Sequence, residues 1–207
     1  MTKIILMPSI LMLLWVLHHN LRKHDPNKQT VDSYLDREEA ANATRRKDLT
    51  NLPYIEVPFN ILPFDITLND EKKQLKIAEY EKEIKNLSSE RMLNLIGISN
   101  TELKEMYGPA NLELLTRYDQ NYSRYIRTLQ FFSECIYEEY PEKAVTIMEY
   151  CITIGTDISG TYNLLGRYYL EHNDKVHFHA LYDKIPVKNS ISGKMIQNKL
   201  NQMQHLD

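Results

Sequence analysis

The spacing of hydrophobic and polar residues changes along the chain and divides it into five segments. Residues 4–17 are apolar and uncharged, residues 20–50 are polar, and from Asn69 onward apolar residues recur three and four positions apart. That last period is typical of amphipathic helices, so we predict an all-α protein. The predicted segments are a membrane anchor at 1–19, a polar linker at 20–50, an extended proline-rich arm at 51–68, the helical N-terminal part of a soluble domain at 69–123, and helical repeats with a capping helix at 124–207.

Capping and breaking residues divide the helical part into individual helices. Ser99 and Glu102 match a capping box, and Pro141 suits the first position of a helix. Helices are predicted over 69–87, 92–96, 99–107, 111–140, 141–154, 157–172, 175–184 and 191–203. The longest of them has one apolar seam, which we predict to be buried: Leu115, Tyr118, Tyr122, Tyr125, Leu129, Phe132 and Ile136.

The apolar run at residues 4–17 predicts a membrane-spanning helix. As a helix the run reaches about 21 Å, which is short of the roughly 30 Å hydrocarbon core of a bilayer. The flanking residues, uncharged apart from Lys3, bring it close to the necessary length, and Trp15 suits the membrane interface. We therefore expect a single span that contacts the lipid bilayer through residues 4–19. A cleaved signal peptide and a buried or interfacial helix are the alternatives.

The orientation of this span follows from the charges beside it. Arg22 and Lys23 come after the run, whereas only Lys3 and the amino terminus precede it. Because cytoplasmic flanks carry the excess of Lys and Arg, we expect the C-terminal domain to be cytoplasmic.

Prolines at positions 53, 58 and 63 interrupt the next segment and prevent a continuous helix. The apolar residues between them alternate, which predicts an extended arm with one apolar face made by Ile55, Val57, Phe59 and Ile61. An apolar face of this kind is expected to pack against another protein surface. The arm is either a structural strap on the helical domain that follows or a site for a separate partner.

Composition and charge exclude several classes of function. The chain has 25 basic and 28 acidic residues and a net charge of -3, so nothing favours nucleic acid as a partner. Only six glycines are present, which favours helices over loops. Cys135 and Cys151 lack the spacing of a zinc site and are predicted to be buried reduced thiols. A disulfide between neighbouring helices is the alternative for a domain outside the cytoplasm.

No motif for catalysis, for a cofactor or for a metal occurs in the sequence. Phosphate-binding, dinucleotide-binding, nucleophile-elbow and zinc-protease motifs are all missing. His177 and His179 are two residues apart, so a helix points them away from each other. We therefore predict that the protein is not an enzyme and holds no cofactor or metal ion.

Residues 161–170 suggest a helical repeat. Tyr162, Leu165, Gly166 and Tyr169 have the spacing of the first helix of a tetratricopeptide repeat, and the chain resembles that family there. The near-identical tetrapeptides that begin at Asp157 and Ser190 lie 33 residues apart, which agrees with the period of 33 to 34 residues that the resemblance predicts. The resemblance covers residues 124–206 and implies a right-handed array of helical hairpins. Two departures, Phe178 for a small residue and Ser190 for proline, leave a related helical-hairpin solenoid as the alternative.

The resemblance also implies a function, which is to bind a peptide or protein on the concave face made by the first helices of the repeats. By register, the binding residues would be Arg127, Gln130, Asn163, Arg167, Leu170, Ile196 and Leu200. Guanidinium and amide groups suit a carboxylate or an extended backbone. The sequence thus predicts a membrane-tethered scaffold or adaptor. The alternatives are a structural subunit of a membrane-associated assembly, whose groove is filled by its own arm at 53–64, and an unrecognised enzyme.

Overall fold

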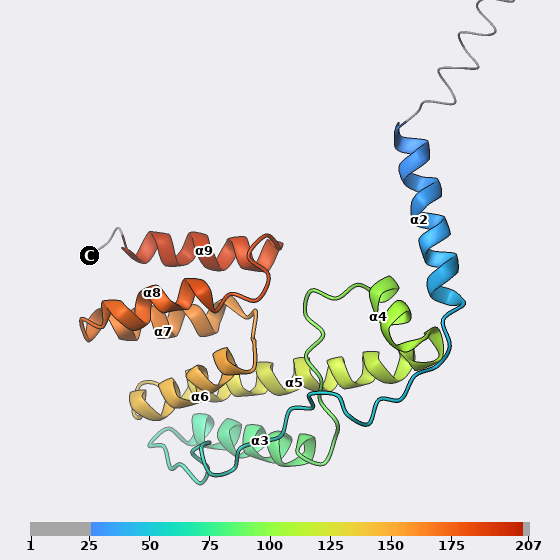
Figure 1. Ribbon diagram of the computed structural model, residues 1–207. Coiled ribbons are helices and arrows are strands. Elements are labelled where there is room, and N and C mark those ends of the chain that lie inside the picture. The colour runs from blue at the N-terminus through green and yellow to red at the C-terminus, as the bar shows by residue number, and fades with distance from the viewer. Residues whose placement is uncertain (1–25, 205–207) are drawn as a thin grey trace, which may run out of the picture. The chain divides into compact units, whose positions relative to one another are not determined.

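The computed structural model describes residues 26–204, and every regular element within that range is helical, which confirms the all-α prediction (Figure 1). The elements are α2 (Pro26–Asn42), α3 (Glu71–Leu87), α4 (Asn100–Tyr107), the short 3₁₀ helix η1 (Pro109–Asn111), α5 (Leu112–Ile136), α6 (Pro141–Thr153), α7 (Ser159–Glu171), α8 (Lys175–Asp183) and α9 (Ile191–Gln204).

The chain forms two compact units. Among the described residues, the smaller contains residues 26–47 and 100–110, and the larger contains residues 48–99 and 111–204. The predicted polar linker at 20–50 therefore contributes a helix, α2, to the smaller unit.

Ion pairs join α2 and α4 in the smaller unit. The guanidinium of Arg37 donates two hydrogen bonds to Glu105, with N–O distances of 2.7 and 2.8 Å. Glu38 accepts hydrogen bonds from Lys104 and from the Thr101 hydroxyl. Arg37 lowers the pKa of the Glu105 carboxyl, and Lys104 and Thr101 lower the pKa of the Glu38 carboxyl. The polar surface of α2 thus provides its contact with α4.

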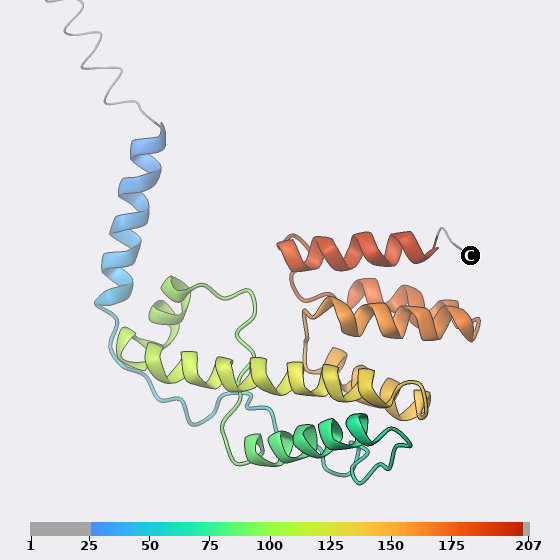
Figure 2. The same ribbon diagram turned by 180° about the vertical axis from the view of Figure 1, so that it is seen from behind.

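In the larger unit the helices form two layers (Figures 1 and 2). Helices α3, α5, α7 and α9 follow one another in what we call the first layer, and α6 and α8 form the second layer. Each second-layer helix packs on the first-layer helix that precedes it in sequence. The second-layer helices begin at Pro141 and Lys175, an offset of 34 residues, and α7 and α9 begin at Ser159 and Ile191, an offset of 32. The unit is a compact stack of helical hairpins.

The predicted seam of α5 is buried, as expected. All seven of its residues are at most 7% exposed. The Tyr122 hydroxyl donates a hydrogen bond to the carbonyl oxygen of Ile154 at 3.1 Å, and the Tyr125 hydroxyl donates to the Tyr150 hydroxyl at 3.4 Å. Burial raises the pKa of Tyr122, so this phenol stays protonated. A tyrosine-rich seam therefore combines apolar packing with hydrogen bonds to neighbouring turns.

The proline-rich arm docks on the larger unit as a strap. Leu62, Ile66 and Leu68 are buried in the same core as α3, α5 and α6. The Tyr150 hydroxyl of α6 donates to the backbone carbonyl of Glu56 at 3.1 Å. The arm runs along α3 on the side of the second layer, where α5 and α7 have the helical partners α6 and α8 (Figure 1). It replaces the missing second helix of the first hairpin.

The predicted apolar face of the arm is only half correct. Ile55 and Val57 pack against the core, but Phe59 and Ile61 are 50% and 47% exposed. A turn causes the difference, because the backbone N–H groups of Ile61 and Leu62 both bond to the Pro58 carbonyl. Beyond this turn the buried position shifts by one residue, from Ile61 to Leu62.

The helix predicted over 92–96 is not formed, although Met92, Leu93 and Leu95 are buried. The backbone there bonds to other segments. The Met92 carbonyl accepts from the Ile55 N–H at 2.9 Å, and the Leu95 N–H donates to the Asp119 carboxylate at 3.2 Å. Hydrogen bonds to the arm and to α5 replace those that a helical turn would supply.

The predicted transmembrane helix, and with it the single-pass membrane localisation, is contradicted. Among residues 26–204 no helix is both long enough and apolar enough to cross a bilayer. The longest, α5, has 25 residues but carries charged side chains along its length. The predicted span at 4–19 lies outside the described residues. That prediction needed flanking residues to extend an apolar run that reaches only about 21 Å as a helix. The cytoplasmic orientation of the C-terminal domain was inferred from the same span and is therefore not supported either.

Gly193 permits a close contact at the start of α9, and we predict that Gly193→Ala destabilises the protein. A Cβ atom there would lie 2.1 Å from the backbone carbonyl oxygen of Val187. Such overpacking costs about 1–3 kcal/mol, which exceeds the gain of roughly 1 kcal/mol in helix propensity. Urea unfolding followed by circular dichroism measures the change. The exposed neighbour gives the control, Lys194→Ala, which should stay within about 0.5 kcal/mol of the wild type.

If the arm is part of the core, Leu62→Ala should lower the free energy of unfolding by about 2–5 kcal/mol. Leu62 is 4% exposed, whereas its neighbour Ile61 is 47% exposed. The matched variant, Ile61→Ala, should therefore cost less than about 1 kcal/mol. Equal losses in the two variants would contradict the observed register of the arm.

Candidate functional site

We call the side of the first layer that faces away from the second layer the outward face. It carries exposed side chains that core packing does not explain. On α5, Phe131 lies two residues from the buried Leu129, so it points to the opposite side of the helix. Phe131 is 46% exposed, and the neighbouring Arg127 and Glu134 are exposed as well. A large aromatic side chain therefore stands on the charged side of an otherwise regular amphipathic helix.

Phe131 stacks on Tyr80 of α3. The two ring centres are 6.3 Å apart, and the ring planes are inclined by 29°. Burial is the main cause of the raised pKa of Tyr80, and the nearby ionisable groups of Cys135, Glu79 and Glu134 raise it further. The pair forms an apolar patch that crosses the α3–α5 contact.

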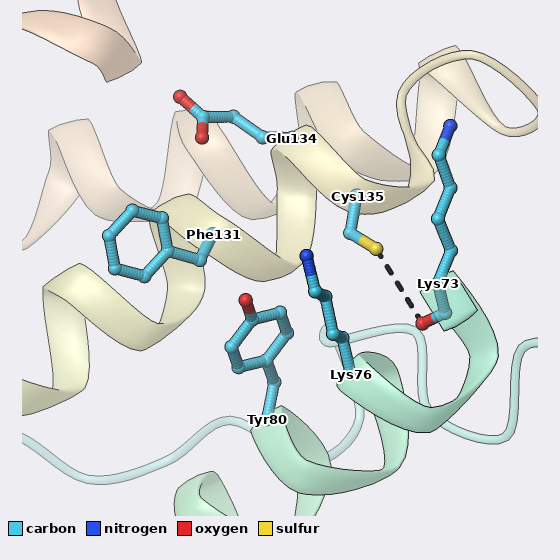
Figure 3. A pocket seen from close by; sticks show the side chains of 6 residues that line it. All are labelled: Lys73, Lys76, Tyr80, Phe131, Glu134 and Cys135. Carbon is cyan, nitrogen blue, oxygen red and sulfur yellow. Dashed lines mark hydrogen bonds between the residues drawn. The ribbon is translucent and has the colours of Figure 1, made fainter.

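A pocket of about 410 Å³ opens beside this pair, and we call it the α3–α5 pocket (Figure 3). Helix α3 provides Lys73, Lys76 and Tyr80, and α5 provides Phe131, Glu134 and Cys135. Figure 3 shows the amine of Lys76 reaching toward α5 beside the Tyr80 hydroxyl. The carboxylate of Glu134 extends in another direction.

Most charges around the pocket are paired within the protein. Lys73 bonds to Glu138 at 2.5 Å, which lowers the pKa of the carboxyl and raises that of the amine. Arg124 pairs with Glu83 across the same two helices. Glu134 accepts a hydrogen bond from the Gln130 amide at 2.6 Å.

Lys76 and Arg127 differ from these residues. Neither forms an ion pair within residues 30–204, and both are exposed. The face therefore presents two cationic side chains that form no ion pair with a carboxylate in that range.

Cys135 lines the pocket with a protonated thiol. Its Sγ atom donates to the backbone carbonyl of Lys73 at 3.7 Å (Figure 3). Burial raises the pKa of this thiol, while the charges of Lys73 and Lys76 lower it in part. Both cysteines are free: Cys151 is fully buried and Cys135 is partly exposed.

Three of the predicted binding residues lie on the outward face. Arg127 is exposed on α5, and Arg167 on α7 places its guanidinium 5.4 Å from the centre of the Tyr137 ring. Asn163 lies one turn before Arg167, and its buried side-chain oxygen has no hydrogen-bond partner among the described residues. These groups extend the face from α5 onto α7.

The other four predicted binding residues contribute to packing. Gln130 is 3% exposed, and its side-chain oxygen accepts from the Thr161 hydroxyl at 2.5 Å, which links α5 to α7. Ile196 and Leu200 are fully buried, and Leu170 packs against the same cluster.

Reasoning from sequence did not identify the α3–α5 pocket, although one signal was available. Phe131 is an apolar residue outside the seam of the longest helix, and such a residue marks an exposed aromatic side chain. Nothing in the sequence indicated that Tyr80 and Lys76 would lie opposite it. That juxtaposition depends on the packing of α3 against α5.

Comparison with known proteins adds no relative. No protein-family model, curated protein or solved structure matches the chain. In the part of the chain that the structure covers, no three His, Cys, Asp or Glu side chains are grouped so that they could hold a metal ion.

The accessibility of Cys135 gives a testable prediction. Iodoacetamide should modify Cys135 in the folded protein and Cys151 only after unfolding, as measured by mass spectrometry. Because burial raises its pKa, Cys135 should reach half its maximal rate at a pH above the value of about 8.5 that is typical of a free thiol.

The same experiment tests the role of Lys76. Its charge lowers the pKa of Cys135, so Lys76→Gln should raise that pKa further and slow the alkylation at pH 8. Lys82→Gln, an exposed site elsewhere on α3, is the matched control and should leave the rate unchanged. Faster alkylation of the Lys76 variant would contradict the proposed electrostatics.

Proposed function

We propose that the larger unit is a divergent tetratricopeptide-like array and that the protein is a scaffold which binds an extended segment of another protein along the outward face of the first layer. The observation that carries the proposal is the exposed Tyr80–Phe131 pair beside the α3–α5 pocket. Aromatic and arginine side chains are the groups that most often anchor a bound partner.

The repeat residues support the tetratricopeptide-like assignment. Tyr162 and Leu165 are fully buried, and Tyr169 is 6% exposed. A Cβ atom on Gly166 would lie 3.2 Å from Leu200 and 3.3 Å from Phe178. A glycine at this position thus permits the close approach of α8 and α9 to α7, as in the family that the sequence resembles.

The cations of the face support binding to an extended chain. Arg127 and Arg167 present guanidinium groups that suit carboxylates and backbone carbonyls. The segment would run across α5 and α7.

The position of the arm favours this function over a groove filled by the chain itself. Its contacts include the core side of α3, the ring of Tyr118 on α5, the hydroxyls of Tyr140 and Tyr150, and the backbone of Met92. The arm therefore leaves that face open to a partner.

A displayed library of random peptides, selected on the full chain, tests the proposal. Selected peptides should bind the Arg127→Glu, Arg167→Glu double variant about ten-fold more weakly, because exposed charge pairs contribute up to about 1 kcal/mol each. Isothermal titration calorimetry gives the affinities, and circular dichroism confirms that the variants are folded.

The control for this test is a Lys82→Glu, Lys175→Glu double variant, which changes the net charge equally at exposed sites away from the face. It should bind the selected peptides as the wild type does. Equal weakening of both variants, or a selection that yields no peptide, would refute the proposed function.

A further inference from the structure

We propose that the α3–α5 pocket is the specificity site of the bound segment, and that it takes an apolar side chain next to an acidic residue. This inference rests on the proposed function and names the chemistry of the partner: an acidic peptide segment in which an Asp or Glu adjoins a large apolar residue. The apolar side chain packs on Phe131 and Tyr80, and the carboxylate pairs with Lys76.

The apolar part of the inference follows from the exposed ring. Phe131 keeps 46% of its surface exposed although Tyr80 already covers one side of it. A pocket of about 410 Å³ lies at the small end of the roughly 300–1,000 Å³ that is typical of ligand sites. It accommodates one or two side chains of a peptide.

The acidic part follows from the balance of charge. Lys73 is already paired with Glu138, and Arg124 with Glu83, so these ions neutralise one another. The amine of Lys76 points into the pocket without an ion-pair partner in the described range (Figure 3). A carboxylate is the group that complements it.

Glu134 is the one pocket residue that opposes an acidic ligand, and its geometry limits that opposition. Its carboxylate accepts a hydrogen bond from Gln130, which lies on the α7 side of α5. In Figure 3 it extends away from the amine of Lys76. The negative charge of Glu134 is thus held at the rim of the pocket far from Lys76. There it repels a carboxylate of the bound peptide, so the acidic residue of the peptide is restricted to the Lys76 side.

The test uses a displayed library of short peptides with one fixed Phe and neighbouring positions that vary among Asp, Asn, Lys and Ser. On the wild-type chain, Asp should be enriched over Asn beside the Phe by about five-fold, which corresponds to about 1 kcal/mol. On Lys76→Glu the preference should reverse toward Lys, while Lys82→Glu should keep the preference for Asp.

Two further measurements place the peptide in the pocket. Phe131→Ala should weaken binding of every selected peptide by at least about ten-fold, because it removes the apolar anchor. A bound acidic peptide should also slow alkylation of Cys135, which lines the pocket, but an Asn-containing peptide at the same concentration should protect it less.

The outcomes separate this inference from the proposed function. Peptides that depend on Arg127 and Arg167 but show no preference for Asp, or that leave Cys135 unprotected, would overturn the specificity site and leave the scaffold function intact. A preference for Asp that persists in Lys76→Glu would also overturn it. Failure to select any peptide would refute both.

Discussion

The larger unit depends on the burial of one side of α5. Seven large side chains of this helix leave water together, and each fully buried side chain of that kind contributes about 1.5–3 kcal/mol, as an upper bound. Helices α3 and α6 and the arm pack against this seam, and the Gln130–Thr161 hydrogen bond connects the same helix to α7. Helix α5 therefore fixes the positions of the elements that form the outward face.

The same constraint explains how the face acquires its chemistry. Because the seam fixes the rotation of α5, Phe131 must point outward and meets Tyr80 on the neighbouring helix. Ion pairs between α3 and α5 then neutralise most of the charges that border this contact, and the amine of Lys76 is left beside an apolar surface. The combination of an unpaired cation and an exposed ring is thus a product of helix packing.

The helices of the larger unit could be predicted because their signals are local. Prolines and glycines mark several of their ends, and the spacing of apolar residues identifies the seam of α5. Residues 92–96 could not be predicted, since their backbone bonds to Ile55 and Asp119, which are distant in sequence. The turn at Pro58 likewise altered the face of the arm. The α3–α5 pocket required knowledge of which helices are neighbours, and a periodic pattern on each helix does not contain it.

The strap has a consequence for the order in which the chain can fold. It leaves the ribosome before the helices that cover it, and its bond from Tyr150 to Glu56 joins residues 94 positions apart. Closing so long a loop costs entropy before the contact contributes any stability, which slows folding. During synthesis the apolar residues of the strap stay exposed until α6 has emerged. A nascent chain of this protein therefore presents an aggregation-prone segment while the residues from α3 to α6 are made, and protection of that segment by a chaperone would matter more than for an array built only of local hairpins.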